Sequence, residues 1–318
     1  MKRPEWIPAI LTILVVLFFA RSSADFRDIP YLLSNTTIFA ETGLLAIGMT
    51  LIIISGNIDL SVGSSLVLTS CLVAKFTSNG TPTILAVVMA LVIGTVLGTI
   101  NGLLITKAKL PSFLVTLATM ALYRGAAQAM MGPSSAKVAQ GLKGIDRSSL
   151  FGLPYPFLIF IVCAIIVGLL LHRMVLGRWL FGIGTNKEAA HYTGFPVDRA
   201  TITAFAITGF LIGISALLMN SRLGVARHDF AKGIELDAIT IVVAGGTAIS
   251  GGKGTMLGTL LSWLLLYFVR TGMGVNNLKA EYQLTIIGII LILSVFSQQL
   301  ADTFSNNRRS KQTKIQTG

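Results

Sequence analysis

The sequence has few charged residues, few cysteines and few histidines. Asp, Glu, Lys and Arg make up only 12% of the 318 residues, against about 25% in soluble domains. Cys71 and Cys163 both fall in apolar runs, which argues against a disulfide framework and against thiol chemistry. The three histidines lie on separate segments without the spacing of metal ligands. The chain therefore looks like neither a disulfide-stabilised secreted domain nor a soluble metalloenzyme, and no cofactor is expected.

Apolar residues are abundant instead, at 53% of the chain with a mean hydropathy of +0.78. Each apolar run is near the roughly 17–25 residues that cross a bilayer, although the first and the eighth are short. Backbone amides in lipid must pair within their own segment, so helices are expected. The fold class predicted is all-α, a polytopic membrane bundle of about ten transmembrane helices. The ten runs are 6–20, 39–56, 60–76, 83–106, 111–131, 154–172, 200–220, 236–250, 255–272 and 282–299.

The net charge of +12 predicts topology and not nucleic-acid binding, because the basic residues are spread through loops and the tail. Two dense basic patches, 173–199 and 308–314, are separated by an even number of spans and fall on one side. That side is expected to be the cytoplasm, with both termini there. No cleavage site follows Lys2 and Arg3, so the first helix is expected to be retained. The domains expected are a membrane domain over 1–304 and a disordered cytoplasmic tail over 305–318.

A polar segment over 173–199 contains the punctuation of a short helix. Asn186 can cap its start, Glu188 would lie in its first turn, and Gly194 and Pro196 would end it. Ala189, Ala190 and Thr193 would then form a small-residue face suited to contact with another protein. A helix lying on the membrane surface is the alternative interpretation.

One six-residue stretch recurs along the chain. Residues 94–99 read GTVLGT and residues 254–259 read GTMLGT, in the fourth and ninth apolar runs. A repeat offset by five helices would invert the topology of the two halves, as in many transporters. Two independent Gly-xxx-Gly packing faces explain the same letters. A five-helix inverted repeat therefore stays one of two interpretations.

Three polar stretches are candidates for a solute pathway. The first is a break between two apolar runs over 55–64; the second is the polar stripe that follows Pro111, near Arg124; the third is the glycine cluster over 245–252. Intramembrane polar groups usually face a cavity or a partner, but helix caps and packing explain most of them equally well. The pathway candidates are Asn57, Asp59, Ser61, Thr116, Thr119, Gly245, Gly246 and Thr247.

Other intramembrane features point away from catalysis. Arg124 needs a carboxylate or carbonyl partner, and Glu41 is expected to be a satisfied polar residue between helices. The glycine cluster ends in Lys253-Gly254, which fails the G-x-x-x-x-G-K-[ST] pattern of a phosphate-binding loop. No nucleophile–base set stands out either. The chain is not expected to bind ATP or to act as an enzyme.

Four segments together resemble the ribose/xylose/galactose-type permease subunits of bacterial ABC sugar importers, a group that also includes rhamnose and autoinducer-2 permeases. They are GNIDLSVGS (56–64), KLPSFLVTLATMALYRG (109–125), GRWLFGIGTNKEAAHYTGFPVDR (177–199) and ELDAITIVVAGGTAISGGKGTMLGT (235–259). The resemblance runs in order along nearly the whole chain. Asn57 departs from the family, which commonly has a second glycine there, and His191-Tyr192-Thr193 replaces smaller residues.

This resemblance implies a subunit of the bacterial inner membrane that pairs with a second permease, the same or a homologous one. It implies two further partners, an ATP-binding subunit that hydrolyses ATP and a periplasmic sugar-binding protein. The coupling helix would comprise Asn186, Lys187, Glu188, Ala189, Ala190 and Gly194. The function expected is therefore import of a monosaccharide or a related polyol-like solute. The alternative is an ion-coupled secondary transporter, with Asp59 or Glu41 as its coupling carboxylate.

Overall fold

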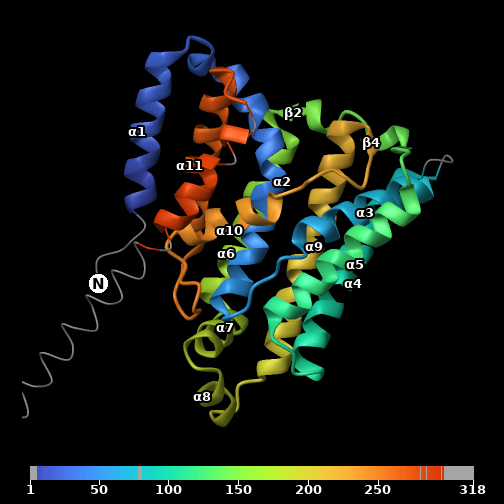
Figure 1. The fold of residues 1–318 in the computed structure, drawn as a ribbon, viewed down its shortest axis with the longest axis vertical. Coiled ribbons are helices and arrows are strands. Elements are labelled where there is room, and N and C mark those ends of the chain that lie inside the picture. Colours follow the sequence, from blue (N-terminus) through green and yellow to red (C-terminus); the bar gives the residue numbers. More distant parts are fainter. Residues whose placement is uncertain (1–5, 78–80, 280, 284, 295, 297–318) are drawn as a thin grey trace, which may run out of the picture.

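The computed structural model describes all residues except 1–5, 78–80, 280, 284, 295 and 297–318. The predicted tail over 305–318 lies outside the described residues. Each of the ten apolar runs forms a helix, which confirms the all-α membrane fold (Figure 1). These helices are α1 (Trp6–Ser22), α2 (Ile29–Ile54), α3 (Val62–Thr77), α4 (Thr83–Lys107), α5 (Ser112–Met131), α6 (Tyr155–Arg173), α9 (Val197–Leu223), α10 (Ile234–Ala244), α11 (Met256–Val275) and a last helix over Glu281–Ser294.

Not every apolar run spans the membrane. Within the described part of the chain, five helices have both the length and the hydropathy of a complete span. The 11 residues of α10 rise only about 16 Å, roughly half the hydrocarbon thickness. The prediction of a full span over 236–250 is therefore wrong, because Gly245 and Gly246 end the helix and the chain turns back before α11.

The two ends of the bundle differ in structure. At one end, α6 and α9 are joined by two short helices, α7 (Val175–Thr185) and α8 (Lys187–Tyr192). The opposite end carries two small antiparallel pairs, β1 (Ala136–Lys137) with β4 (Val225–Ala226) and β2 (Ser149–Leu150) with β3 (Leu153–Pro154) (Figure 1). The short 3₁₀ helices η2 (Gln140–Leu142) and η3 (Ile145–Arg147) lie between β1 and β2, and η1 (Asp25–Arg27) joins α1 to α2.

The helix α2 lies in the centre of the bundle. Every residue from Ala40 to Ile54 is buried, and α9, α6, α10 and α11 pack around it. A helix that is apolar on all sides is expected to be surrounded in this way. The end of α2, at Ile54, consequently lies deep inside the protein.

Glycines bring α4 and α9 into backbone contact. A Cβ atom on Gly98 would lie 3.0 Å from Gly209 Cα, and one on Gly213 would lie 2.9 Å from Leu91 Cα. Small residues permit such close approach of membrane helices. By contrast, Gly254 precedes α11 with a φ of +155°. The two GTxLGT segments thus occupy different structural positions, and the inverted repeat stays a prediction.

Candidate functional site

The predicted short helix forms as α8, and its caps are confirmed. Asn186 adopts an extended backbone, and its Oδ1 accepts a hydrogen bond from Ala189 N at 2.9 Å. At the other end Gly194 has a φ of +82°. Phe195 N donates to Ala190 O at 3.0 Å, which completes a Schellman-type end. A helix of only six residues is held by these caps, since so short a helix is marginal on its own.

The faces of α8 differ from the prediction in one respect. Ala190 is only 4% exposed and faces the rest of the chain, whereas Ala189 and Thr193 are exposed. The proposed shared face of Ala189 and Ala190 is therefore wrong, because adjacent helical residues point about 100° apart. Tyr192, 88% exposed, lies beside Ala189 on the free surface. The exposed residues of α8 are Lys187, Glu188, Ala189, His191 and Tyr192.

The helix α7 was not predicted. Gly177, Leu180 and Ile183 are buried at a spacing of three, which is the helical pattern that the sequence carried and that the short polar interruptions obscured. The helix packs against α6, α2 and α9. Because it ends at Thr185 and Asn186 caps α8, α7 fixes the position of α8 against the bundle.

Two loops and the end of α7 meet at the inner end of α2 in what we call the glycine junction, formed by Gly56, Gly184 and Gly251. A Cβ atom on Gly251 would lie 2.8 Å from Gly56 Cα and 2.9 Å from Gly184 Cα. Gly252 N donates a hydrogen bond to Ile54 O at 2.9 Å. The junction places the end of α7, the break after α2 and the loop after α10 in direct backbone contact. A displacement of α7 would therefore also move the two loops that contain Gly56 and Gly251.

The polar break after α2 forms a closed hydrogen-bond network. Asp59 Oδ1 accepts from Ser61 N at 2.8 Å and from Ser61 Oγ at 2.6 Å. Asn101 Nδ2 of α4 donates to Ser61 Oγ at 2.8 Å, and Tyr123 Oη of α5 lies 3.5 Å from Asn101 Oδ1. Sequence reasoning named Asp59 and Ser61 but missed Asn101, which sits between apolar residues without a motif. The network links α3, α4 and α5.

The other pathway candidates are brought to the same interior but face protein. Thr116 Oγ1 donates to Ile58 O at 3.2 Å, and Thr119 Oγ1 donates to Thr116 O at 3.3 Å. Asn57 bonds within its own turn to Ser55 Oγ. Gly245 packs on Gly258 of α11, and Gly246 and Thr247 form the turn after α10. None of the eight candidates lines the cavity described below, so their role in a pathway stays a prediction.

Basic side chains inside the bundle each have a partner. Arg222 of α9 binds both carboxylate oxygens of Glu41 on α2, at 2.8 and 2.9 Å. Arg270 of α11 donates to Asp237 of α10 at 2.6 and 2.7 Å. Arg124 donates to the carbonyl oxygens of His228 and Phe230 at 3.0 and 2.7 Å. The expectations that Glu41 is satisfied and that Arg124 finds a carbonyl are confirmed.

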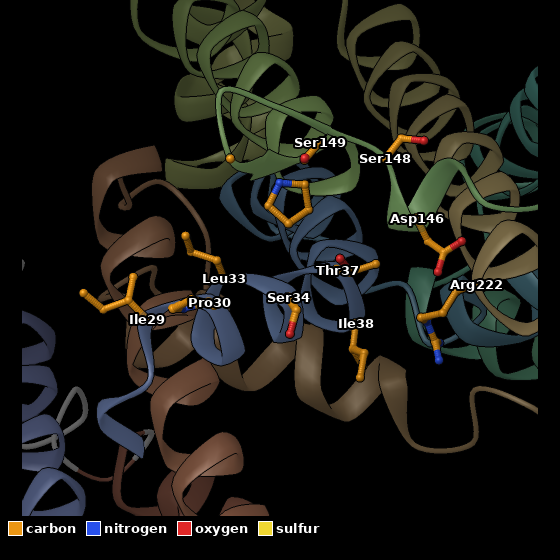
Figure 2. A pocket seen from close by; sticks show the side chains of 12 residues that line it. Ile29, Pro30, Leu33, Ser34, Thr37, Ile38, Asp146, Ser148, Ser149 and Arg222 are labelled. Atoms are coloured by element: carbon orange, nitrogen blue, oxygen red, sulfur yellow. The ribbon is translucent and has the colours of Figure 1, made fainter. Parts of the chain in front are cut away.

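A cavity of about 770 Å³ opens at the end of the bundle opposite α8. The start of α2 forms one wall, the segment 146–154 forms another, and Arg222 closes the end (Figure 2). Its lining combines hydroxyl groups, one carboxylate and aliphatic side chains. Its twelve residues are Ile29, Pro30, Leu33, Ser34, Thr37, Ile38, Asp146, Ser148, Ser149, Gly152, Pro154 and Arg222. Sequence reasoning named none of them, because the two walls lie more than a hundred residues apart.

The chain is similar to a known family of membrane transport proteins over most of its length. The family model described as branched-chain amino acid transport system / permease component matches residues 31–295. No group of three or more His, Cys, Asp and Glu side chains within the described part of the chain could hold a metal ion. No solved structure matches the chain.

Curated relatives match over most of their length. The ribose import permease protein RbsC of Bacillus subtilis (strain 168) is 39% identical over 259 residues, 80% of each chain. The autoinducer 2 import system permease protein LsrD of Yersinia enterocolitica is 35% identical over 309 residues, 94% of this chain and 93% of the relative. LsrD of Photorhabdus laumondii is 32% identical over 304 residues. All three relatives are named as permeases, and their names give different solutes, ribose for RbsC and autoinducer 2 for the two LsrD proteins.

Proposed function

The chain belongs to the family of permease components of branched-chain amino acid transport systems, and from that premise we propose that it is the membrane subunit of an ATP-driven sugar importer. Its solute would be a monosaccharide or a related small polyol-like compound, because the relatives that match along its length are named as ribose and autoinducer 2 permeases. The four polar segments that carry the family pattern lie within residues 31–295.

The observation that carries this proposal is α8, a short helix with both ends capped on an exposed loop. The chain has no phosphate-binding loop, so the energy for transport must come from a partner. A small helix with an exposed aromatic residue suits a groove on such a partner. We assign this groove to the ATP-binding subunit, and Ala189 and Tyr192 of α8 would make the contacts with it.

Motion at α8 has two ways into the bundle. Through Phe195 and Pro196 it reaches α9, which starts at Val197. Through α7 it reaches the glycine junction and thus the loop before α3 and the loop after α10. The first route continues from α9 to α4, which packs against it and carries Asn101 of the polar network, and the second ends at the loop that carries Asp59 and Ser61. Closure of the ATP-binding subunits would then separate the groups of this network and let the solute pass.

The remaining partners and the orientation follow from the same proposal. With α8 in the cytoplasm of a bacterial cell, the cavity and the β-strand pairs face the periplasm and a sugar-binding protein. The amino-terminal helix α1 would then start in the cytoplasm. A second permease, identical or homologous, completes the pathway. ATP hydrolysis belongs to the separate subunit.

Reconstitution in proteoliposomes tests the proposal. The chain, with its ATP-binding subunit and binding protein, is expected to take up labelled D-ribose, D-xylose, D-galactose or L-rhamnose only with ATP on the cytoplasmic side. Collapse of uptake by a protonophore, with no need for ATP, would instead identify an ion-coupled transporter. In that case Asp59 would be the candidate coupling carboxylate, because Arg222 holds both oxygens of Glu41.

A matched pair of variants tests the role of α8. Ala189→Arg adds a bulky charge to the exposed face of α8 and is expected to abolish uptake while the protein inserts and folds normally. The control is Ala108→Arg, also exposed and at the same end of the bundle, beside the Lys107–Asp198 ion pair. Normal uptake and normal ATPase stimulation in Ala189→Arg would contradict the assignment.

A further inference from the structure

The cavity at the end opposite α8 has the features of a ligand site. We propose that it is the place where a neutral, polyhydroxylated solute first contacts this subunit. The inference rests on the proposed function, which puts this end of the bundle in the periplasm. The volume of about 770 Å³ lies within the usual range for small-molecule sites.

The hydroxyl groups in the lining are the first observation. Most threonines in these helices donate to a backbone carbonyl three or four residues earlier, as Thr36 does to Leu33 O at 2.6 Å. Thr37, one residue later, is 7% exposed, and its side-chain hydroxyl makes no hydrogen bond to any described residue. Its side chain and that of Ser34 border the same space (Figure 2). An unused hydroxyl there is available to a solute hydroxyl.

The charges in the lining are the second observation. Arg222 lines the cavity, and Glu41 holds its Nε and Nη2 atoms, so its charge is already balanced. Asp146 adds one further carboxylate at the rim, where it accepts a hydrogen bond from Ser221 Oγ at 3.3 Å. The carboxylate of a solute such as an amino acid would find no uncompensated cation among the lining residues. A neutral solute with several hydroxyls meets donors and acceptors only.

The aliphatic wall is the third observation. Ile29, Leu33 and Ile38 lie on α2 beside Ser34 and Thr37, across the cavity from Ser148 and Ser149. A sugar ring has apolar C–H faces and polar edges, so it can use both walls at once. The opening of the cavity at the end of the bundle allows a solute released outside to reach Thr37 before any interior helix moves.

The experiment uses the complete importer in proteoliposomes. Labelled D-ribose, D-xylose, D-galactose, L-rhamnose and L-leucine are tested for ATP-dependent uptake. For the imported sugar, Thr37→Val and Asp146→Asn are each expected to lower uptake at low concentration by roughly three- to tenfold, the effect of one lost hydrogen bond. The matched control Thr36→Val removes a hydroxyl from the adjacent position, which is not in the cavity, and should stay within twofold of wild type.

A second measurement does not depend on transport. Ser34→Cys is made in a chain with Cys71→Ala and Cys163→Ala, and a membrane-impermeant methanethiosulfonate is added from outside. Labelling of this cysteine is expected, and the imported sugar should slow it while L-leucine should not. Labelling that only a lipophilic thiol reagent achieves would indicate an acyl chain in the cavity and overturn the inference.

The outcomes separate this inference from the proposed function. Sugar uptake in which Thr37→Val and Asp146→Asn match Thr36→Val, with no protection of the cysteine, overturns the cavity site alone. Absence of ATP-dependent uptake of every tested sugar by the unmodified importer refutes the proposed function and takes the cavity site with it.

Discussion

The ion pair between Arg222 and Glu41 provides the sharpest prediction about stability. Glu41 is 4% exposed at its side chain and Arg222 is 24% exposed, and two hydrogen bonds of 2.8 and 2.9 Å join them. Glu41→Gln leaves a guanidinium without its counter-charge between α2 and α9. Loss of one partner of a buried pair costs about 3–5 kcal/mol. Since Arg222 is partly solvated, we expect about 2–4 kcal/mol.

The measurement is a double-mutant cycle in detergent micelles. Unfolding is followed by SDS titration for wild type, Glu41→Gln, Arg222→Gln and the double variant. The double variant removes both charges and is expected to recover most of the loss, giving a coupling energy of about 2 kcal/mol or more. The exposed pair Lys107–Asp198, at 65% and 50% exposure, is the control, and Asp198→Asn should cost less than about 1 kcal/mol. A coupling energy for Glu41–Arg222 no larger than that of the surface pair would refute the reasoning.

Two further predictions concern the caps and the glycines. Asn186→Ala removes the bond to Ala189 N and should cost α8 about 1 kcal/mol; ATP-driven uptake should fall while Asn186→Ser, which can still cap, keeps it, and equal uptake in both variants would argue against the cap. Gly209→Leu forces a side chain into the backbone of α4 and should destabilise the fold by about 3 kcal/mol or more. Gly125→Leu, where no atom lies within 4 Å, should leave SDS stability unchanged or raised, and an equal loss in the two glycine variants would contradict the close packing of α4 and α9.

Helix caps and apolar runs could be predicted from the sequence because they depend on residues that are close together in the chain. Asn186, Gly194 and Pro196 lie within eleven residues, so their capping roles follow from type and spacing alone. The positions of the ten apolar runs follow from the same local reasoning. The carbonyl partner of Arg124 could be expected as a class, although its identity, the loop at His228 and Phe230, could not.

Features that depend on distant contacts were not predictable in this way. The inward face of α8 is set by packing against the rest of the chain, so Ala190 could not be told from Ala189. The partner of Ser61 is Asn101, forty residues away. The short length of α10 depends on whether the glycines end the helix or are tolerated inside it. The hydropathy of the sequence is the same in both cases. The cavity joins two walls that share no motif.

The glycine contact between α4 and α9 has a mechanical consequence. Helices whose backbones are in contact cannot slide past each other without steric clash. We therefore expect α4 and α9 to move as one rigid unit. The 27 residues of α9 extend about 40 Å, from just beyond α8 to Arg222 at the cavity. A force on the α8 end of this helix pair would therefore tilt α4 and α9 together and displace their opposite end. The subunit would thus work as a lever whose two arms are the site of energy input and the site of solute entry.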